Sequence, residues 1–429
     1  MKVLMFGWEF PPHITGGLGT ACFGLTKGLL KSGVEVLFVV PKSYGDEDQR
    51  AVRLINASDV SIDFTDKAYQ EHWKQLTYIE IGSNLIPYVG EEEFSNFSTG
   101  KELENTSEYS SVFSRQYIFS GKYGKNLMEE VTRYALVAST IAGEQQFDVI
   151  HAHDWLTYPA GMAAKKVSGK PLVVHMHATE FDRSGEHINQ NVYDIERKGM
   201  EAADAVITVS NYTRDIVVNR YGINPDKVFT VHNAVEHTSG DADLVVEKKV
   251  REKVVTFLGR VTFQKGPDYF VEAAKRVLDK DKNVRFVMAG SGDMLNRMVL
   301  RVAQLGISTH FHFTGFLQGE EVDKMFLLSD VYVMPSVSEP FGISPLEAMR
   351  SSVPVVISKQ SGVAEVLKYA LKIDFWDIDA MADAIYGLLH YEALSKVFRQ
   401  FGKEEVETLK WDNAAVKVSD VYNKVVFKK

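Results

Sequence analysis

A nine-residue segment contains the chain's best-placed pair of carboxylates. It reads E-P-F-G-I-S-P-L-E from Glu339 to Glu347, with seven residues between the two glutamates. Gly342 marks a turn that passes into a helix at Ser344-Pro345. Such a turn offers free backbone N–H groups to an anionic or polyhydroxylated ligand, and the glutamates can accept hydrogen bonds from sugar hydroxyls. The segment therefore predicts a sugar-nucleotide site.

The same residues have a purely structural interpretation. Ser344-x-x-Glu347 fits a capping box, in which Pro345 takes the first helical position and Glu347 serves only the helix terminus. Short motifs of this kind also arise by chance. The segment alone fits both interpretations, and a capped helix could itself present the amides to a ligand.

A second glycine-rich turn follows the first apolar run of the chain. Gly16 and Gly17 open a helical pattern, where backbone amides could approach a phosphate at a helix N-terminus. The spacing differs from the dinucleotide fingerprint G-x-G-x-x-G, and glycine at such turns is also common for steric reasons. We favour ligand contact.

Two basic residues lie at a comparable junction in the second half. Arg260 leaves an apolar run and Lys265 precedes the next helical pattern, so both cations could converge on one diphosphate. Exposed basic residues are usually only solvated, but these two are flanked by glycines. A further glycine-rich turn follows at Gly290-Ser-Gly292.

Histidines occur in two alternating pairs at the ends of predicted strands. His151 and His153 share one side of the first strand, and Asp154 is well placed to cap the following helix. A metal site is conceivable, but no third ligand is apparent, so buried hydrogen-bonded histidines are favoured. His175 and His177 alternate in the same way. His177, at the strand end, could donate to a sugar hydroxyl or to a reacting oxygen, although a lone histidine is more often structural.

The bulk properties indicate an ordinary globular protein. The chain has 429 residues, 45% hydrophobic and 24% charged, which predicts two or three domains. A net charge of -9 argues against a nucleic-acid or anionic-membrane surface. The single cysteine, Cys22, excludes an internal disulfide and a cysteine-based zinc site, and it fits a reducing compartment and a small core residue. We see no signal peptide or membrane span and expect a cytoplasmic protein.

Short apolar runs alternate with helical patterns almost throughout. This is typical of an α/β protein with buried parallel sheets, here two Rossmann-like doubly wound domains with a cleft between them. We expect strands at 2–6, 35–39, 149–153, 172–177, 205–209, 228–231, 254–258, 284–289, 310–314, 331–334 and 353–357, and helices at 18–31, 126–144, 156–168, 211–221 and 411–426. The predicted domains are 1–240, with a polar insertion at about 43–124, then 241–410, and a final helix at 411–429 that crosses back to the first domain. The segment 234–251 is the predicted linker.

Taken together, these residues resemble the GT-B retaining glycosyltransferases, specifically family 4 (group 1) and the related bacterial glycogen and starch synthases. The resemblance spans nearly the whole chain. It is carried by Gly16-Gly17, the H-x-H-D-W at 151–155, His177, Gly259-Arg260 with Lys265-Gly266, and the paired glutamates.

The resemblance implies a division of labour between the domains. The first domain would bind a saccharide acceptor, with His153 and Asp154 on that side, and the second a nucleotide diphosphate sugar. Catalysis would involve His177, Glu339, Arg260 and Lys265. Donor binding would involve Gly16, Gly17, Arg260, Lys265, Gly342, Ile343, Ser344 and Glu347, with Glu339 at the sugar hydroxyls and Glu347 at the ribose. The sugar would be transferred with retention and without a metal. Asp241-Ala-Asp243 and Asp377-Ile-Asp379 resemble the D-x-D of the other glycosyltransferase fold, but we expect both to be structural.

Some positions depart from the glycogen synthases. Thr15 stands where a lysine often precedes the first Gly-Gly, their later Gly-Gly turn is Ser361-Gly362, and the chain is short. We favour an α-glucan-elongating enzyme that uses ADP-glucose or UDP-glucose. The alternatives are a family 4 transferase acting on a lipid-linked or cell-surface saccharide, a GT-B-fold nucleotide-sugar epimerase, and a sensor that binds donor without turnover.

Overall fold

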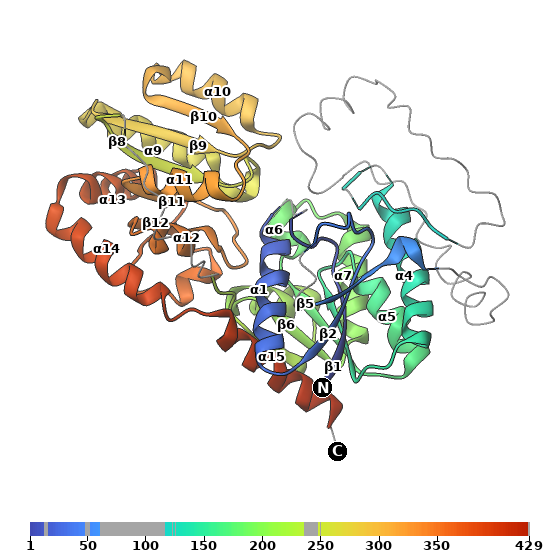
Figure 1. Ribbon diagram of the computed structural model, residues 1–429. Coiled ribbons are helices and arrows are strands. Elements are labelled where there is room, and N and C mark those ends of the chain that lie inside the picture. Colours follow the sequence, from blue (N-terminus) through green and yellow to red (C-terminus); the bar gives the residue numbers. More distant parts are fainter. Residues whose placement is uncertain are drawn as a thin grey trace.

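Two open parallel sheets, each covered by helices, form the computed structural model (Figure 1). It describes residues 1–12, 16–47, 52–60, 116–121, 123–124, 126–235, 248 and 250–427. The predicted fold class is confirmed. Within these ranges no helix is both long and apolar enough to span a membrane.

The first sheet has the strand order β3-β2-β1-β4-β5-β6-β7, and all its neighbours pair in parallel. Its strands are β1 (Lys2–Phe6), β2 (Glu35–Val40), β3 (Arg53–Asn56), β4 (Val149–His153), β5 (Leu172–Met176), β6 (Ala205–Thr208) and β7 (Val228–Thr230). The helices among them are α1 (Gly17–Lys31), η1 (Ala57–Asp59), α4 (Leu127–Glu144), α5 (Tyr158–Ser168), α6 (Glu180–Ser184), α7 (Gln190–Ala202), α8 (Asn211–Tyr221) and η3 (Pro225–Lys227).

The second sheet repeats this plan with the order β10-β9-β8-β11-β12-β13. Its strands are β8 (Lys253–Leu258), β9 (Val284–Ala289), β10 (Phe311–Gly315), β11 (Val331–Met334), β12 (Val355–Ser358) and β13 (Leu371–Ile373). Its helices are η4 (Phe263–Lys265), α9 (Pro267–Lys280), α10 (Leu295–Gln304), η5 (Ser308–His310), α11 (Glu320–Leu328), α12 (Ser344–Arg350), η6 (Gly362–Glu365), α13 (Ile378–His390) and α14 (Glu392–Val406). In both sheets the strand order reverses beside the first strand, and ligands of such sheets bind at the carboxyl ends of the strands there.

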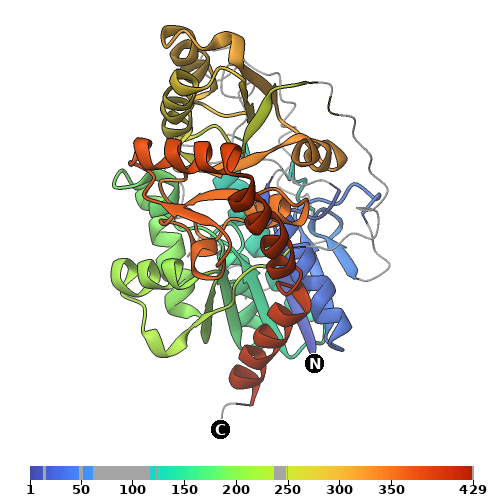
Figure 2. The ribbon, with the colours of Figure 1, turned by 90° about the vertical axis from the view of Figure 1, so that its left-hand side faces the viewer.

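The final helix, α15 (Trp411–Val426), runs from the second domain onto the first (Figure 2). It packs along α1, and its apolar face joins the core formed by β1, β2 and α1. Two glycines permit this close approach. A Cβ on Gly24 would lie 2.2 Å from the Trp411 indole nitrogen, and one on Gly28 would lie 2.7 Å from the Trp411 carbonyl oxygen.

Two of the expected boundaries need comment. The segment 43–124 was expected to lack regular structure, but residues 53–56 form β3, the edge strand of the first sheet, paired with β2. The apolar run in this segment is too short and too irregular to predict a strand. The strand is stabilised by its pairing with β2. Most of the remaining insertion, and most of the predicted linker at 234–251, lies outside the described residues.

Candidate functional site

The loop after β11 holds Glu339 against Lys265. The Lys265 ammonium lies 2.5 Å from a Glu339 carboxylate oxygen, which also accepts a hydrogen bond of 3.1 Å from the Ser336 hydroxyl. The Glu339 backbone is fixed as well, because its N–H donates to the Gln360 carbonyl and its own carbonyl accepts from the Gly362 N–H. Glu339 is 6% exposed. The loop therefore presents a buried carboxylate paired to the lysine expected at a diphosphate.

Arg260 and Lys265 belong to one tight junction between β8 and α9. The Arg260 guanidinium donates to the Gln264 side chain at 2.9 Å, and the Gln264 carbonyl accepts from the Val337 N–H at 2.9 Å. The segment that carries both cations thus lies directly beside the Glu339 loop. Lys265 therefore meets Glu339, while the convergence of Arg260 and Lys265 on one diphosphate stays a prediction.

Close backbone approach at the strand ends makes this junction possible. Gly290 has φ 140° and a Cβ there would lie 1.8 Å from the Gly259 carbonyl oxygen. Gly292 has φ 158° and a Cβ there would lie 2.4 Å from the Val261 carbonyl oxygen. The Gly-Ser-Gly turn therefore packs against the Arg260 turn, and a side chain at either glycine would separate them.

The start of α12 differs from the predicted capping box. The helix begins at Ser344 with Ile343 before it, and no side chain caps it. The Ser344 hydroxyl instead makes a 2.8 Å hydrogen bond with the Tyr332 hydroxyl of β11. A tertiary partner thus replaces the local one, and the capping-box interpretation is wrong. Gly342, at φ 99°, makes the preceding turn.

Glu347 lies in the first turn of α12 and is partly buried. Removal from water raises the pKa of its carboxyl group, and the nearby Arg350 guanidinium opposes this shift. A helix N-terminus favours a carboxylate, and Glu347 lies in the first turn of this helix.

On the first domain, Gly16 and Gly17 form the predicted start of α1. Gly16 precedes the helix and Gly17 is its first residue. Among the residues that the structure describes, a Cβ at either position would meet no atom within 4 Å. That arrangement is consistent with a ligand approaching the helix N-terminus.

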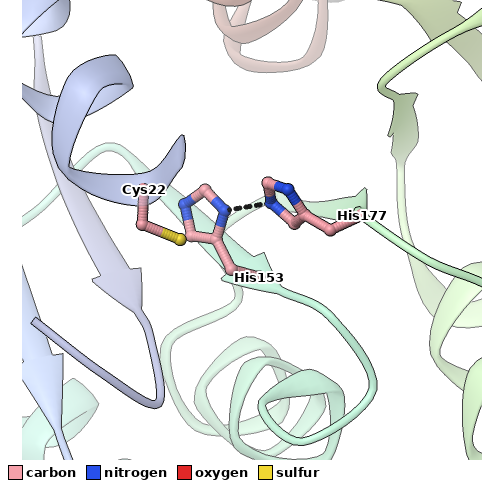
Figure 3. Close-up of side chains that lie close together, drawn as sticks. All are labelled: Cys22, His153 and His177. Carbon is pink, nitrogen blue, oxygen red and sulfur yellow. Dashed lines mark hydrogen bonds between the residues drawn. The ribbon is translucent and has the colours of Figure 1, made fainter. Parts of the chain in front are cut away.

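The four histidines form a stack at the ends of β4 and β5. Ring centroids lie 4.2 Å apart for His151 and His153, and 4.3 Å apart for His175 and His177, so each pair shares one face of its strand, as alternation predicts. His153 Nδ1 and His177 Nε2 are 2.9 Å apart and hydrogen-bonded (Figure 3). His151 Nδ1 meets the Tyr422 hydroxyl of α15 at 2.5 Å.

Burial governs the charge of this stack. Loss of water lowers the pKa of His151 and of His177 to about 3, and the pKa values of His153 and His175 also fall well below the ordinary value. The histidines are therefore neutral at physiological pH.

One expectation around the stack is wrong. Asp154 does not cap α5, because that helix begins at Tyr158 without a side-chain cap. Asp154 has φ 62° and its carboxylate accepts from the Trp155 N–H. The fold also brings Cys22 of α1 beside the His153 ring, with His177 on the other side of that ring (Figure 3).

The two domains meet through residues that sequence reasoning missed. The Ser338 hydroxyl donates to the Asp182 carboxylate at 2.5 Å and lies 2.9 Å from the Tyr212 hydroxyl. The Ser210 hydroxyl donates to the Pro340 carbonyl at 2.5 Å. The Glu339 loop is thereby held against α6 and α8, and α6 follows closely after His177. The only local signal was Thr179-x-x-Asp182, which forms a capping box at α6.

Comparison with known proteins agrees with this architecture. The family described as starch synthase catalytic domain matches residues 2–231, and the family described as glycosyl transferases group 1 matches residues 243–405. The chain belongs to the starch synthase family of glycosyltransferases. Its GT-B fold and its resemblance to glycogen and starch synthases, both predicted from the sequence, are confirmed.

Individual relatives of this glycosyltransferase cover between 65% and 99% of the chain. An uncharacterized glycosyltransferase of Methanocaldococcus jannaschii is 29% identical over 98% of each chain. An alpha-maltose-1-phosphate synthase of Mycolicibacterium smegmatis is 31% identical over 65% of this chain and 79% of its own. The catalytic domain of Starch Synthase IV from Arabidopsis thaliana, solved with ADP and acarbose, superposes with a TM-score of 0.66 at 14% identity and covers 99% of each chain.

Proposed function

We propose that this glycosyltransferase moves a hexose, with glucose favoured, from ADP-glucose or UDP-glucose to an α-glucan, and that the anomeric configuration is retained. The observation that supports this most directly is the Lys265–Glu339 pair. Glu339 lies on a loop that the Asp182–Ser338 hydrogen bond holds against α6 of the first domain, and α6 follows His177 in the chain. A diphosphate-binding cation, a sugar-binding carboxylate and a neutral imidazole thus belong to one region between the domains.

The donor phosphates would replace Glu339, in part, as the negatively charged partner of Lys265. Arg260 would bind them as a fork and Lys265 as a point charge. The amides of Gly16 and Gly17 and those of Gly342, Ile343 and Ser344 would complete the cradle. Glu339, freed from Lys265, would accept from donor-sugar hydroxyls, and Glu347 would hold the ribose.

The transfer needs no protein nucleophile and no metal. The bond between the anomeric carbon and the diphosphate oxygen breaks, and the acceptor hydroxyl oxygen bonds that carbon on the same face. The hydroxyl proton passes to the departing diphosphate. Catalysis rests on orientation and on the two cations, which stabilise the charge that develops on the leaving group.

His177 would act as a neutral hydrogen-bonding group toward the donor sugar. Its hydrogen bond to His153 fixes the ring, and its partial removal from water lowers its pKa and keeps it uncharged. His153 and Asp154, which we place on the acceptor side, are fully buried or nearly so. They would therefore position His177 and the neighbouring backbone.

The test is a donor panel with maltooligosaccharide acceptors, run in the presence of a chelator. We expect chain elongation with ADP-glucose or UDP-glucose and an α-configured product by NMR. Glu347→Gln should weaken donor binding and leave the thermal unfolding temperature nearly unchanged. No elongation with any donor would overturn the glucan assignment. Conversion of donor without acceptor would instead indicate an epimerase, and transfer only to a lipid-linked saccharide would indicate the other acceptor class.

A further inference from the structure

The first turn of α8 takes part of its cap from the other domain. The Asn211 and Tyr212 N–H groups donate to the two carboxylate oxygens of Glu365, at 2.9 Å and 2.6 Å. Glu365 is the last residue of η6 in the second domain, whereas α8 belongs to the first. The Thr213 N–H donates instead to the Ser210 side chain, at 3.0 Å. Two free N–H groups at the start of this helix are therefore satisfied across the domain boundary.

His232 holds the same carboxylate from a second element of the first domain. It follows β7, and its Nε2 lies 2.9 Å from the Glu365 oxygen that accepts from Asn211. Both side chains of this pair are 23% exposed. Partial burial raises the pKa of the Glu365 carboxyl group, but the hydrogen bonds from His232 and α8 outweigh it and lower the pKa below its ordinary value. Glu365 is therefore ionised at neutral pH, the form that a helix N-terminus stabilises.

Glu365 lies on η6, which is hydrogen-bonded to the Glu339 loop. The Gly362 N–H donates to the Glu339 carbonyl at 2.9 Å, and the Val363 N–H donates to the Phe341 carbonyl at 2.8 Å. Both bonds join backbone to backbone. Because Gly362 and Glu365 are the two ends of one short helix, a shift of Glu365 would also move the loop that carries Glu339.

The first turn of α8 also contacts the Glu339 loop directly. The Tyr212 hydroxyl lies 2.9 Å from the Ser338 hydroxyl, and the Ser210 hydroxyl donates to the Pro340 carbonyl at 2.5 Å. A Cβ on Gly362 would lie 2.2 Å from the Pro340 carbonyl oxygen and 2.4 Å from the Ser210 Cβ. The helix, the loop and η6 are therefore packed against one another without space between them.

We propose that Glu365 is a positioning residue for sugar transfer, whose carboxylate fixes the Glu339 loop against the first domain. The inference rests on the proposed function, in which Glu339 binds the donor sugar and His177 acts from the other domain. All the hydrogen bonds described for the Glu365 carboxylate go to the first domain, so it acts through the loop and not on the substrate. Transfer depends on orientation, and a misplacement of about 1 Å can lower a rate by about 10²-fold.

The test compares Glu365→Ala with Glu405→Ala in the full-length protein. Glu405 is the matched control, because its carboxylate also accepts from two successive backbone N–H groups. These belong to Lys368 and Tyr369, at 2.8 Å and 3.0 Å, and the whole contact lies within the second domain. Circular dichroism and urea unfolding establish that each variant is folded.

The kinetic result should separate positioning from donor binding. With the donor and acceptor that the panel identifies, Glu365→Ala should lower kcat at least about tenfold, because Glu339 is no longer fixed relative to the first domain. Calorimetric titration should give an affinity for ADP or UDP within about threefold of the wild type, because Arg260 and Lys265 belong to the same domain as Glu365. Glu365→Gln keeps one acceptor oxygen and should lose less kcat than Glu365→Ala. Glu405→Ala should keep both values.

Hydrogen exchange measures the contact itself, without turnover. The amides of Asn211 and Tyr212 should exchange faster in Glu365→Ala than in the wild type and in Glu405→Ala. Unchanged exchange would overturn the proposal, because the cap from the second domain would then be absent in solution. Equal kcat in Glu365→Ala and Glu405→Ala would also overturn it and would leave Glu365 as a helix cap alone. Absence of transfer in the wild type with every donor is a separate result, which would overturn the proposed function.

Discussion

Lys265 and Glu339 neutralise one another while no donor is bound. Both side chains are largely buried, at 19% and 8% exposure, and their charged atoms lie 2.5 Å apart. A buried charge that loses its partner is strongly destabilising, whereas an exposed pair contributes little. The pair therefore stabilises the loop, in addition to the role in phosphate binding that we propose for Lys265.

Lys265→Met should weaken nucleotide-sugar binding at least tenfold, because a cation at the diphosphate is lost. It should also destabilise the protein by about 3 kcal/mol, because Glu339 stays buried without its counterion. Calorimetric titration with donor and urea unfolding measure the two effects. Lys280→Met removes a lysine of the same domain whose ion pair with Asp383 is exposed, and donor affinity should not change. Equal donor affinity in the wild type and Lys265→Met would contradict the assignment.

Glu196 should make stability fall as the pH rises. It is fully buried and contacts Arg183 and the Tyr221 hydroxyl. Burial raises the pKa of its carboxyl group from 4.5 to about 8, against the opposing effect of Arg183. Between these pH values the folded protein holds a proton that the unfolded chain has lost. Its stabilising contribution is complete below pH 4.5 and is lost as the pH rises through 8.

Glu196→Gln removes this titration and keeps the shape of the side chain. Urea unfolding at pH 6, 7 and 8 should show a decline in the wild type that exceeds the decline in the variant by up to about 1.4 kcal/mol per pH unit. Parallel stability curves for the two proteins would show that Glu196 is ionised throughout this range.

At the scale of elements, the turns at the ends of β8 and β9 lie so close that their backbones are in contact, with glycine at the points of contact. The turn after β9 touches the turn after β8, and this contact places Arg260 beside the Glu339 loop. Elsewhere a tertiary hydrogen bond overrides a local preference: Ser344 bonds Tyr332 of β11 and leaves α12 without a side-chain cap.

Gly290→Ala should disrupt the second domain. A Cβ there would lie 1.8 Å from the Gly259 carbonyl, so the two turns must separate, in addition to the strain of a positive φ. We expect a loss of more than about 3 kcal/mol together with weaker donor binding. Gly306→Ala is the control, since Gly306 also has a positive φ, 68°, but has open space around its Cβ position. Gly306→Ala should lower the free energy of unfolding by about 1–2 kcal/mol. An equal loss in both variants would show that the close approach at Gly290 does not contribute to stability.

At the scale of the whole molecule, α15 joins the two domains. It leaves the second domain and runs onto the first (Figure 2), where it completes the core. There Trp411 packs against the two small residues Gly24 and Gly28 of α1. The Tyr422 hydroxyl of the same helix reaches His151. The last helix thus makes a direct hydrogen bond with the histidine stack.

Trp411→Ala should destabilise the protein by about 3–5 kcal/mol, because it empties a large buried site between α1 and α15. Val416→Ala, on the exposed side of the same helix at 53% exposure, should change stability by less than about 0.5 kcal/mol. Urea midpoints compare the two. Similar midpoints in both variants would show that α15 is not part of the cooperative core.

The sequence alone determined the architecture, and it also predicted the residues of the proposed donor site. Buried parallel strands have an apolar signature on both faces, and β1, β4, β9 and β11 lie where that pattern predicts. Arg260 and Lys265 are close in sequence and lie in one junction between β8 and α9, so their proximity could be predicted from the spacing alone. β3 was missed, because an edge strand needs little apolar character and depends on its neighbour.

Only the tertiary structure decided which residues meet across long separations. Ser338 and Asp182 are 156 positions apart, and Cys22 approaches His153 from another element. Neither contact leaves a periodic or local pattern, because packing between elements sets it. The same holds for Ser344. Its local sequence fits a helix cap, but in the structure its hydroxyl makes a hydrogen bond with the Tyr332 hydroxyl. A local helix cap contributes about 1 kcal/mol, so a hydrogen bond to a partner from another element can replace it.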